Sequence, residues 1–241
     1  MTALIPKLKF SLPLICVSFA ALGLSSACHA DTSVIEHILG ESSSIVTIQA
    51  QKITAGSTMN SGPMEVREQS GAGVIIDPAG YIATNTHIIL YADRIFVTLS
   101  NGIRLPATIA AIAPATDFSI LKIDAPFSLE ALPWADPHLL TLGTKIISVG
   151  NTPLWKETIC GGTITGIANT LSTGSVGLIE MDLALDRGDS GGPVLDRQGQ
   201  FLGIIVAKNM KVERSSYALP AWNIREFFLN YLIERQKENV Q

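Results

Sequence analysis

The sequence predicts an all-β protein built from two antiparallel, six-stranded β-barrels, with a short helix near its N-terminus and another at its C-terminus. Three observations lead to this fold class. Short runs of hydrophobic and β-branched residues alternate with turns that contain glycine, proline or asparagine through most of the 241 residues. No alternation of strand and helix patterns is visible, which disfavours a parallel sheet. A segment with three prolines, residues 126–138, divides the predicted strands into two halves.

The first thirty residues have the three-part layout of a secretory signal peptide. Two lysines precede an apolar run over residues 10–24, and Cys28-His29-Ala30 places small residues where a cleavage site requires them. The run is shorter than the ~20 residues that a membrane-spanning helix needs, and Pro13 interrupts it. We therefore expect residues 1–30 to be removed and the mature protein to be exported, either to the periplasm or out of the cell. A lipid anchor on Cys28 is the less favoured alternative.

Residues 31–125 are predicted to hold the N-terminal helix and the first barrel. Ser33 and Glu36 match the capping-box pattern at the start of a helix, and Gly40 marks its end. The polar stretch over residues 54–70 is predicted to be a long surface loop. Strands are expected at residues 45–48, 73–76, 81–85, 95–99, 105–112 and 120–123.

Residues 126–138 are predicted to be a linker, and residues 139–241 to hold the second barrel and the C-terminal helix. That helix has Asn223 as its expected N-cap, Glu226 three residues later and an apolar face that we expect to pack on the second barrel. Strands are expected at residues 145–149, 157–167, 178–183, 193–195, 201–207 and 217–219.

The composition excludes several classes of function. The net charge is only −4, and lysine and arginine do not cluster, so a nucleic acid is not an expected partner. No group of histidine, cysteine or glutamate has the spacing of metal ligands, so neither a metal nor a cofactor is expected.

A glycine-rich turn, Gly188-Asp189-Ser190-Gly191-Gly192-Pro193, is the strongest chemical signal in the sequence. Glycine adopts backbone conformations that other residues avoid, so such a turn can expose a serine hydroxyl and direct backbone N–H groups outward. A nucleophilic serine needs both, because its attack creates an oxyanion that must be bound by hydrogen-bond donors. On its own, the motif fits a simple turn between two strands equally well.

Two upstream segments, Asn85-Thr86-His87 and Thr116-Asp117-Phe118, supply the partners that such a serine needs. An imidazole can take the proton of the hydroxyl, and a carboxylate fixes which imidazole nitrogen carries hydrogen. Histidine and aspartate come from the first half of the chain and Ser190 from the second. We therefore expect the three side chains to meet in a cleft between the barrels.

Other residues compete for these roles. Asp93 is only six residues from His87, which is too local to approach the ring from behind, and Asp124 precedes Ala-Pro as a turn residue would. His37 and His138 are expected to be surface or structural residues, since one stands in the predicted first helix and the other in the linker.

Together with Gly71-Ala72-Gly73-Val74-Ile75-Ile76-Asp77 and Val149-Gly150-Asn151, these motifs resemble those of HtrA/Deg-type trypsin-like serine proteases, which have the chymotrypsin fold. The resemblance covers about residues 41–230. Several spaced motifs in the order His, Asp, Ser are much more specific than any single one.

The resemblance implies a role for each of these residues. His87 is the general base, Asp117 orients it and Ser190 is the nucleophile. The N–H groups of Gly188 and Ser190 form the oxyanion hole.

The resemblance also implies the residues that bind substrate. The floor of the primary specificity pocket falls on Ala184, six residues before the nucleophile, and its opposite wall on Tyr217. The substrate backbone is expected to add as a strand along Val206-Ala207-Lys208. Because alanine offers no charge to a lysine or arginine, we expect a preference for Val, Ala, Ile or Leu before the cut.

The implied function is a serine endopeptidase that hydrolyses unfolded or misfolded polypeptides through an acyl-enzyme. The alternative is a non-catalytic chaperone or adaptor on a protease fold. Two features depart from the family: Asp189 stands where asparagine is usual, and no PDZ domain follows the protease. Family members often form trimers, so a homotrimer is a further expectation.

Overall fold

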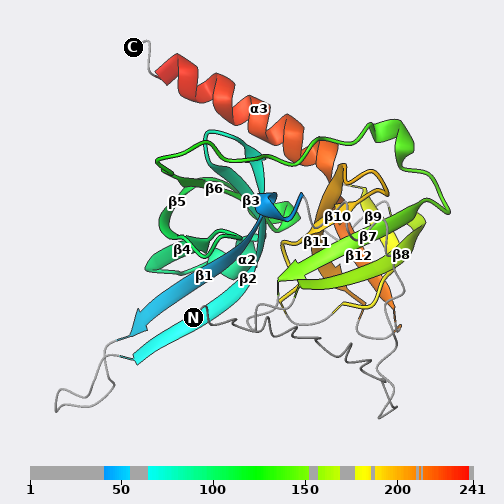
Figure 1. Ribbon diagram of the computed structural model, residues 1–241, viewed down its shortest axis with the longest axis horizontal. Helices are drawn as coiled ribbons and strands as arrows, with labels where there is room; N and C mark the ends of the chain where they lie inside the picture. Colours follow the sequence, from blue (N-terminus) through cyan, green and yellow to red (C-terminus); the bar gives the residue numbers. More distant parts are fainter. Residues whose placement is uncertain are drawn as a thin grey trace, which may run out of the picture.

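The computed structural model describes residues 41–54, 65–151, 157–168, 177–185, 188–209, 212 and 214–238. Figure 1 shows two barrels side by side and a long C-terminal helix that runs from the second barrel out past the first. The predicted signal peptide at residues 1–30 and the predicted helix at residues 33–40 lie outside the described residues.

The first barrel is closed, with antiparallel neighbours in the order β1-β2-β3-β6-β5-β4. A 3₁₀ turn (Glu41–Ser44) precedes it, another (Pro114–Thr116) leads into β6, and the short helix α2 (Thr86–Ile89) follows β3. Its interior is filled by buried aliphatic side chains, among them Val46, Ile48, Ile75, Val97 and Leu121. The strands are β1 (Ile45–Thr54), β2 (Glu65–Asp77), β3 (Tyr81–Thr84), β4 (Arg94–Thr98), β5 (Arg104–Ala113) and β6 (Phe118–Ile123).

The second barrel repeats this plan in the order β10-β11-β12-β9-β8-β7. A 3₁₀ turn (Pro137–Leu139) precedes it, and the helix α3 (Ala221–Glu238) follows it directly. Two closed six-stranded antiparallel barrels with a C-terminal helix confirm the predicted fold class. The strands are β7 (Lys145–Asn151), β8 (Glu157–Ala168), β9 (Leu178–Asp182), β10 (Pro193–Leu195), β11 (Phe201–Lys208) and β12 (Ser215–Pro220).

The predicted loop over residues 54–70 is wrong for residues 65–70, which belong to β2. Strands β1 and β2 stay paired out to Thr54 and Glu65, so the hairpin extends as a two-stranded arm beyond the barrel (Figure 1). Polar cross-strand contacts hold it: Gln49 Nε2 donates to Glu68 Oε1 at 2.8 Å. Such pairs stabilise a strand without burying it, and hydrophobic alternation therefore does not reveal it.

Helix α3 also differs from its prediction. It begins at Ala221, so Asn223 lies inside its first turn and is not its N-cap. The helix contacts both barrels and not only the second. The rings of Phe228 and Tyr81 of the first barrel lie 5.0 Å apart, and Arg235 Nη1 donates to the Tyr81 hydroxyl at 2.5 Å.

The segment that was predicted to be a linker is hydrogen-bonded to both barrels. Leu132 N–H donates to the Ile75 carbonyl at 3.1 Å, and Phe201 N–H donates to the Pro133 carbonyl at 2.7 Å. The rings of Trp134 and Phe201 lie 5.4 Å apart, and Phe201 is fully buried in the core cluster to which both barrels contribute. The two barrels therefore share part of one hydrophobic core.

We expect Phe201→Ala to lower the free energy of unfolding by about 3–5 kcal/mol, because it leaves a cavity where the barrels meet. Urea denaturation followed by tryptophan fluorescence measures the loss. Phe127→Ala is the matched control, since Phe127 is 40% exposed, and its cost should be within about 1 kcal/mol. Equal costs for the two variants would contradict the shared core.

Candidate active site

His87 is presented to the surface by the burial of its neighbours. All four residues of β3 are buried, and the chain then turns into α2, where Ile88 and Ile89 are each 1% exposed. The helix packs these two side chains inward, so the preceding side chain must face outward. The His87 side chain is 43% exposed.

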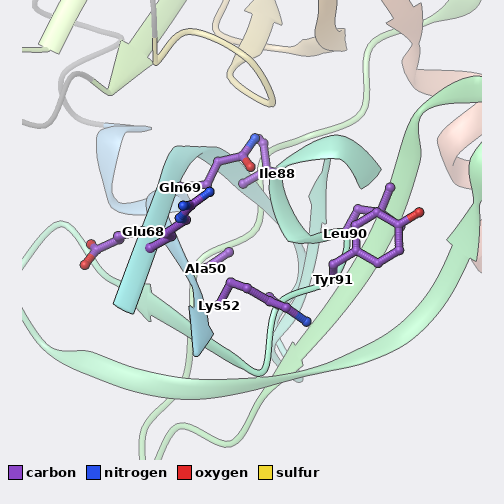
Figure 2. A pocket seen from close by; sticks show the side chains of 9 residues that line it. Ala50, Lys52, Glu68, Gln69, Ile88, Leu90 and Tyr91 are labelled. Carbon is purple, nitrogen blue, oxygen red and sulfur yellow. The ribbon is translucent and has the colours of Figure 1, made fainter. Parts of the chain in front are cut away.

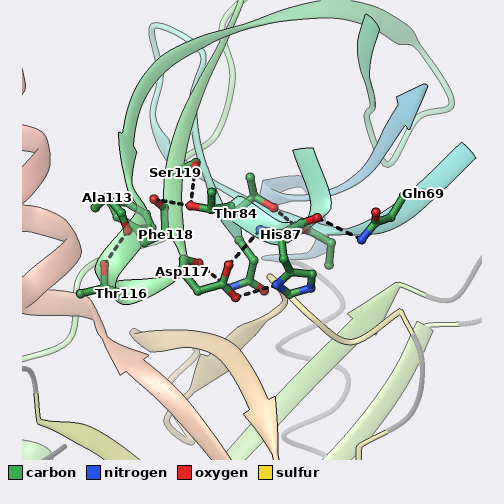
Figure 3. A network of polar contacts seen from close by, with 11 residues as sticks. Gln69, Thr84, His87, Ala113, Thr116, Asp117, Phe118 and Ser119 are labelled. Carbon is green, nitrogen blue, oxygen red and sulfur yellow. Dashed lines mark hydrogen bonds and ion pairs between the residues drawn. The ribbon is translucent and has the colours of Figure 1, made fainter. Parts of the chain in front are cut away.

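Asp117 reaches His87 from the start of the neighbouring strand, because β6 pairs with β3. It lies between a 3₁₀ turn and β6, with a left-handed backbone (φ 52°, ψ 40°) that aspartate tolerates better than most residues. Its Oδ1 accepts the His87 N–H at 2.8 Å, and its Oδ2 lies 2.6 Å from His87 Nδ1. Figure 3 shows the ring and the carboxylate pointing toward each other. The carboxylate therefore holds both the backbone and the ring of His87.

A set of small polar residues fixes the Asp117 turn against α2. Asn85 Nδ2 and Thr86 N–H both donate to the Asp117 carbonyl, each at 3.1 Å. Thr86 Oγ1 donates to the Phe118 carbonyl at 2.9 Å and lies 2.8 Å from Ser119 Oγ. Asn85, Thr86 and Phe118 belong to the two sequence motifs that supply His87 and Asp117, and Ser119 directly follows the second motif. A sequence feature that could have revealed this network is the presence of polar residues at buried strand ends, where apolar residues are usual.

The two competing aspartates are engaged elsewhere. Asp93 Oδ2 accepts the Ile53 N–H at 2.7 Å, and its Oδ1 lies 3.8 Å from Lys52 Nζ. Asp124 pairs with Lys122 at 2.5 Å, and this hydrogen bond and charge hold the pKa of Asp124 below its usual range. Among the three candidate acids, the structure brings Asp117 to His87.

The Ser190 turn is tied to both barrels by its backbone. Ala72 N–H of β2 donates to the Ser190 carbonyl at 2.9 Å. On the other side, Gly191 N–H donates to the Ile205 carbonyl of β11 at 3.0 Å, and Ile205 N–H donates to the Gly192 carbonyl at 2.9 Å. The turn is therefore clamped between β2 and β11, in the position where the barrels meet.

Gly71 places this turn close to the helix that carries His87. A Cβ atom on Gly71 would lie 3.0 Å from Ile88 Cγ1 and 3.1 Å from the Ser190 carbonyl oxygen. The backbone at Gly71 thus lies between α2 and the Ser190 turn, with no room for a side chain.

Asp189, the residue that departs from the resemblance, is buried beside β7. It is 2% exposed, and a Cβ atom on Gly150 would overlap its Oδ1. Its carbonyl accepts the Gly192 N–H at 2.9 Å, which closes the turn. Arg187, two residues before it, lies outside the described residues.

Four of the predicted substrate-binding residues belong to β11 and its neighbour β12. Ala207 and Tyr217 are directly opposite each other in the β11–β12 ladder, whereas Val206 falls at an irregularity in the register. Lys208 Nζ donates to the Leu185 carbonyl at 3.3 Å, which ties the segment that follows Ala184 to β11. Val206, Ala207, Lys208 and Tyr217 therefore lie together at the end of β11, and Lys208 contacts the residue that follows Ala184.

Within the described part of the chain, no three histidine, cysteine or acidic residues gather as metal ligands. Among the same residues, no helix has the length and apolar character to cross a membrane.

Comparison with known protein families identifies the class of protein. The trypsin-like peptidase domain matches residues 71–204, more than half of the chain and including His87, Asp117 and Ser190. The chain therefore belongs to the trypsin-like peptidase family.

Its relatives include Do-like and Deg proteases. It is 33% identical over 150 residues to the chloroplastic Protease Do-like 1 of Arabidopsis thaliana, covering 60% of this chain and 34% of the relative. It is also 33% identical over 150 residues to the serine endoprotease DegS of Escherichia coli strain K12, covering 61% of this chain and 42% of the relative. The chain thus spans well under half the length of these two relatives.

A solved structure shows the same fold. The HtrA-type protease AlgW with decapeptide superimposes with a TM-score of 0.73 at 24% identity, over 83% of this chain and 67% of that one.

We expect Gly191→Ala to destabilise the protein more than Gly102→Ala, which has the same kind of backbone. Both glycines have a positive φ, +80° at Gly191 and +83° at Gly102, so alanine costs about 1–2 kcal/mol of backbone strain at either position. Only at Gly191 would the new Cβ overlap the Ala72 carbonyl, whereas at Gly102 nothing lies within 4 Å. Urea denaturation compares the two, and equal losses would show that the turn does not press on β2.

Proposed function

We propose that this chain is a serine endopeptidase in which Ser190 is the nucleophile, His87 the general base and Asp117 the residue that orients it. The observation that carries the proposal is the 2.6 Å contact between His87 Nδ1 and Asp117 Oδ2. It is supported by the Ser190 turn, which packs against Gly71 opposite the helix that carries His87. Membership of the trypsin-like peptidase family supports the same reaction.

The chemistry follows from this arrangement. With Nδ1–H donating to Asp117, the second ring nitrogen of His87 is left as the base that takes the Ser190 proton. The hydroxyl oxygen attacks the peptide carbonyl, and the N–H groups of Gly188 and Ser190 bind the oxyanion. The imidazolium then protonates the leaving amine. Water hydrolyses the acyl-enzyme by the same steps, and Ser190 is regenerated.

Gly188 suits the proposed oxyanion hole, because its φ of +106° is closed to other residues. Such a backbone lets the N–H groups on either side of Asp189 point the same way. The buried Asp189 side chain, packed against Gly150, would hold that peptide in place.

The proposed substrates are unfolded or misfolded polypeptides of an exported compartment. An extended peptide is needed to pair with the end of β11, and unfolded chains supply extended segments most readily. Three of the matched relatives carry names that include "periplasmic serine endoprotease", among them DegP of Salmonella typhimurium. The signal-peptide pattern over residues 1–30 supports export of this chain. The homotrimer stays a prediction.

We expect a fluorophosphonate probe to label the wild-type protein, and Ser190→Ala to lose both labelling and hydrolysis of a denatured protein. Ser190 is half-buried and its hydroxyl adds little packing, so the thermal unfolding midpoint should change by less than about 2 °C. An unlabelled wild-type protein that still prevented aggregation of a denatured substrate would favour the chaperone alternative.

We expect cleavage mainly after Val, Ala, Ile or Leu, because Ala184 offers no charge at the floor of the pocket. Differences of one methylene are worth only about 1–3 kcal/mol, so the preference should be broad. Mass spectrometry of a digested peptide library measures it. Ala184→Asp is the sharper test, since an acid there should bring cleavage after Lys or Arg. If the library pattern stays unchanged in that variant, Ala184 does not line the pocket.

A further inference from the structure

We infer that Thr84 is a positioning residue for the proposed nucleophile: its buried hydroxyl fixes the backbone of Ala72, and Ala72 in turn holds Ser190. The inference rests on the proposed peptidase function and adds a residue that neither the proposed triad nor the proposed oxyanion hole includes. Thr84 ends β3, three residues before His87, and is fully buried. Figure 3 shows it in the group of polar residues around His87 and Asp117.

The hydroxyl of Thr84 binds the backbone of β2. Its Oγ1 donates to the Ala72 carbonyl at 2.9 Å, and both residues are fully buried. The backbone pairs between β2 and β3 end at Val74 and Ala83, so at Ala72 a side-chain donor takes the place of the ladder. An apolar residue instead of Thr84 would remove this donor, and a buried carbonyl without a hydrogen bond is costly.

Ala72 connects this hydroxyl to the proposed nucleophile. Its N–H donates to the Ser190 carbonyl at 2.9 Å. The N–H and C=O of one residue in a strand point to the same side, so both backbone groups of Ala72 face away from its β1 partner, Thr47. Strand β1 therefore does not fix these two groups. The Thr84 hydroxyl and the Ser190 carbonyl bind them from the same side.

The Thr84 hydroxyl also lies against the turn itself. A Cβ atom on Gly191 would lie 2.9 Å from Thr84 Oγ1 and would overlap the Ala72 carbonyl. The hydroxyl, that carbonyl and the backbone that follows Ser190 therefore meet without a gap. A displacement of Ala72 is transmitted directly to the turn.

The preceding part of β2 gives Ala72 little support. Gln69, three residues earlier in the strand, is exposed. Together with Ile88 it lines a groove of about 520 Å³ between β1, β2 and the end of α2 (Figure 2). Gln69 Nε2 donates to the His87 carbonyl at 3.1 Å, but hydrogen bonds of exposed side chains open readily. The buried contact with Thr84 is therefore the stronger constraint on Ala72.

Two threonines on either side of Asn85 bind different parts of the site. Thr86 Oγ1 donates to the Phe118 carbonyl, next to Asp117. Thr84 Oγ1 donates instead to β2, which holds the proposed nucleophile. The same chemical change at the two positions therefore tests the two halves of the site separately.

The first test compares hydrolysis of a quenched fluorescent peptide by the wild-type protein, Thr84→Val and Thr84→Ser. Valine has nearly the shape of threonine but no hydroxyl, whereas serine keeps the hydroxyl. A misplacement of about 1 Å costs on the order of 100-fold in rate, so we expect Thr84→Val to lower kcat by about 10- to 100-fold. KM should change little, because the residues proposed to bind substrate belong to β11 and β12. Thr84→Ser should keep kcat within about 3-fold of the wild-type value.

Two results of this test would overturn the inference. One is a kcat of Thr84→Val within about 3-fold of the wild-type value. The other is an equal loss of kcat in Thr84→Ser, because packing and not the hydroxyl would then be responsible. If Thr84→Val does not fold, Thr84→Ala and Thr84→Ser decide the question, since they differ by one hydroxyl. We expect the lower kcat in Thr84→Ala, and equal values would contradict the role of the hydroxyl.

Hydrogen exchange separates this inference from the peptidase function, because it needs no turnover. The Ala72 N–H is bound to Ser190, so we expect it to exchange about 10-fold faster or more in Thr84→Val. The Ile123 N–H, which donates to the Gly80 carbonyl at 3.0 Å in the same barrel, reports any general loss of stability. The ratio of the two exchange rates therefore isolates the contact with the turn.

Thr86→Val is the matched control, since it also removes a buried threonine hydroxyl of the first barrel. It should leave the ratio of Ala72 to Ile123 exchange at its wild-type value. If the wild-type protein hydrolyses no peptide but this ratio rises in Thr84→Val, the peptidase function fails and the role of Thr84 in holding the turn stands. An unchanged ratio in Thr84→Val would refute that role even if the peptidase is active.

Discussion

The hydrogen bond from Ala72 N–H to the Ser190 carbonyl, 2.9 Å long, is the constraint on which the rest of the candidate site depends. It joins the two barrels at the point where the nucleophile and the base must meet. Backbone can approach backbone this closely only where side chains are missing, which accounts for glycine at positions 71 and 191. The barrels also share the core around Phe201, and the hydrogen bonds of Gly191 and Gly192 to Ile205 of β11 hold the other side of the same turn.

The other half of the site is local to the first barrel. His87 and Asp117 lie at the ends of β3 and β6, which are neighbouring strands of the same closed sheet, and Asn85 and Thr86 donate to the backbone carbonyls around them. A buried polar cluster of this kind is stabilising when its members are paired, and costly when one is removed. The fold thus separates two tasks: the first barrel holds the proposed base, and the contact between the barrels brings the proposed nucleophile to it.

Much of this could be predicted from the sequence, for physical reasons that also explain what could not. Strands such as residues 73–76 and 120–123 are buried on a barrel wall, so β-branched runs between turns reveal them. The arm at residues 65–70 is held by polar pairs across strands, which leave no hydrophobic period. Pairs such as Lys52 and Arg67 are hidden for a different reason, since they are fifteen residues apart in sequence and meet only through the register of β1 and β2. The network from Thr86 to Ser119 likewise depends on which strand ends come together.

The placement of the candidate triad on two barrels also determines when, during synthesis and folding, the site is assembled. A chain is synthesised and emerges from its N-terminal end, and β6, the last strand of the first barrel, ends at Ile123. His87 and Asp117 can therefore pair while Ser190 is still to be made. The hydroxyl is aligned only when β10 and β11 have closed the second barrel onto Ala72. A chain that is only partly synthesised or partly folded accordingly carries no assembled site. Neighbouring nascent chains therefore meet an assembled site only after the chain that carries it has finished folding.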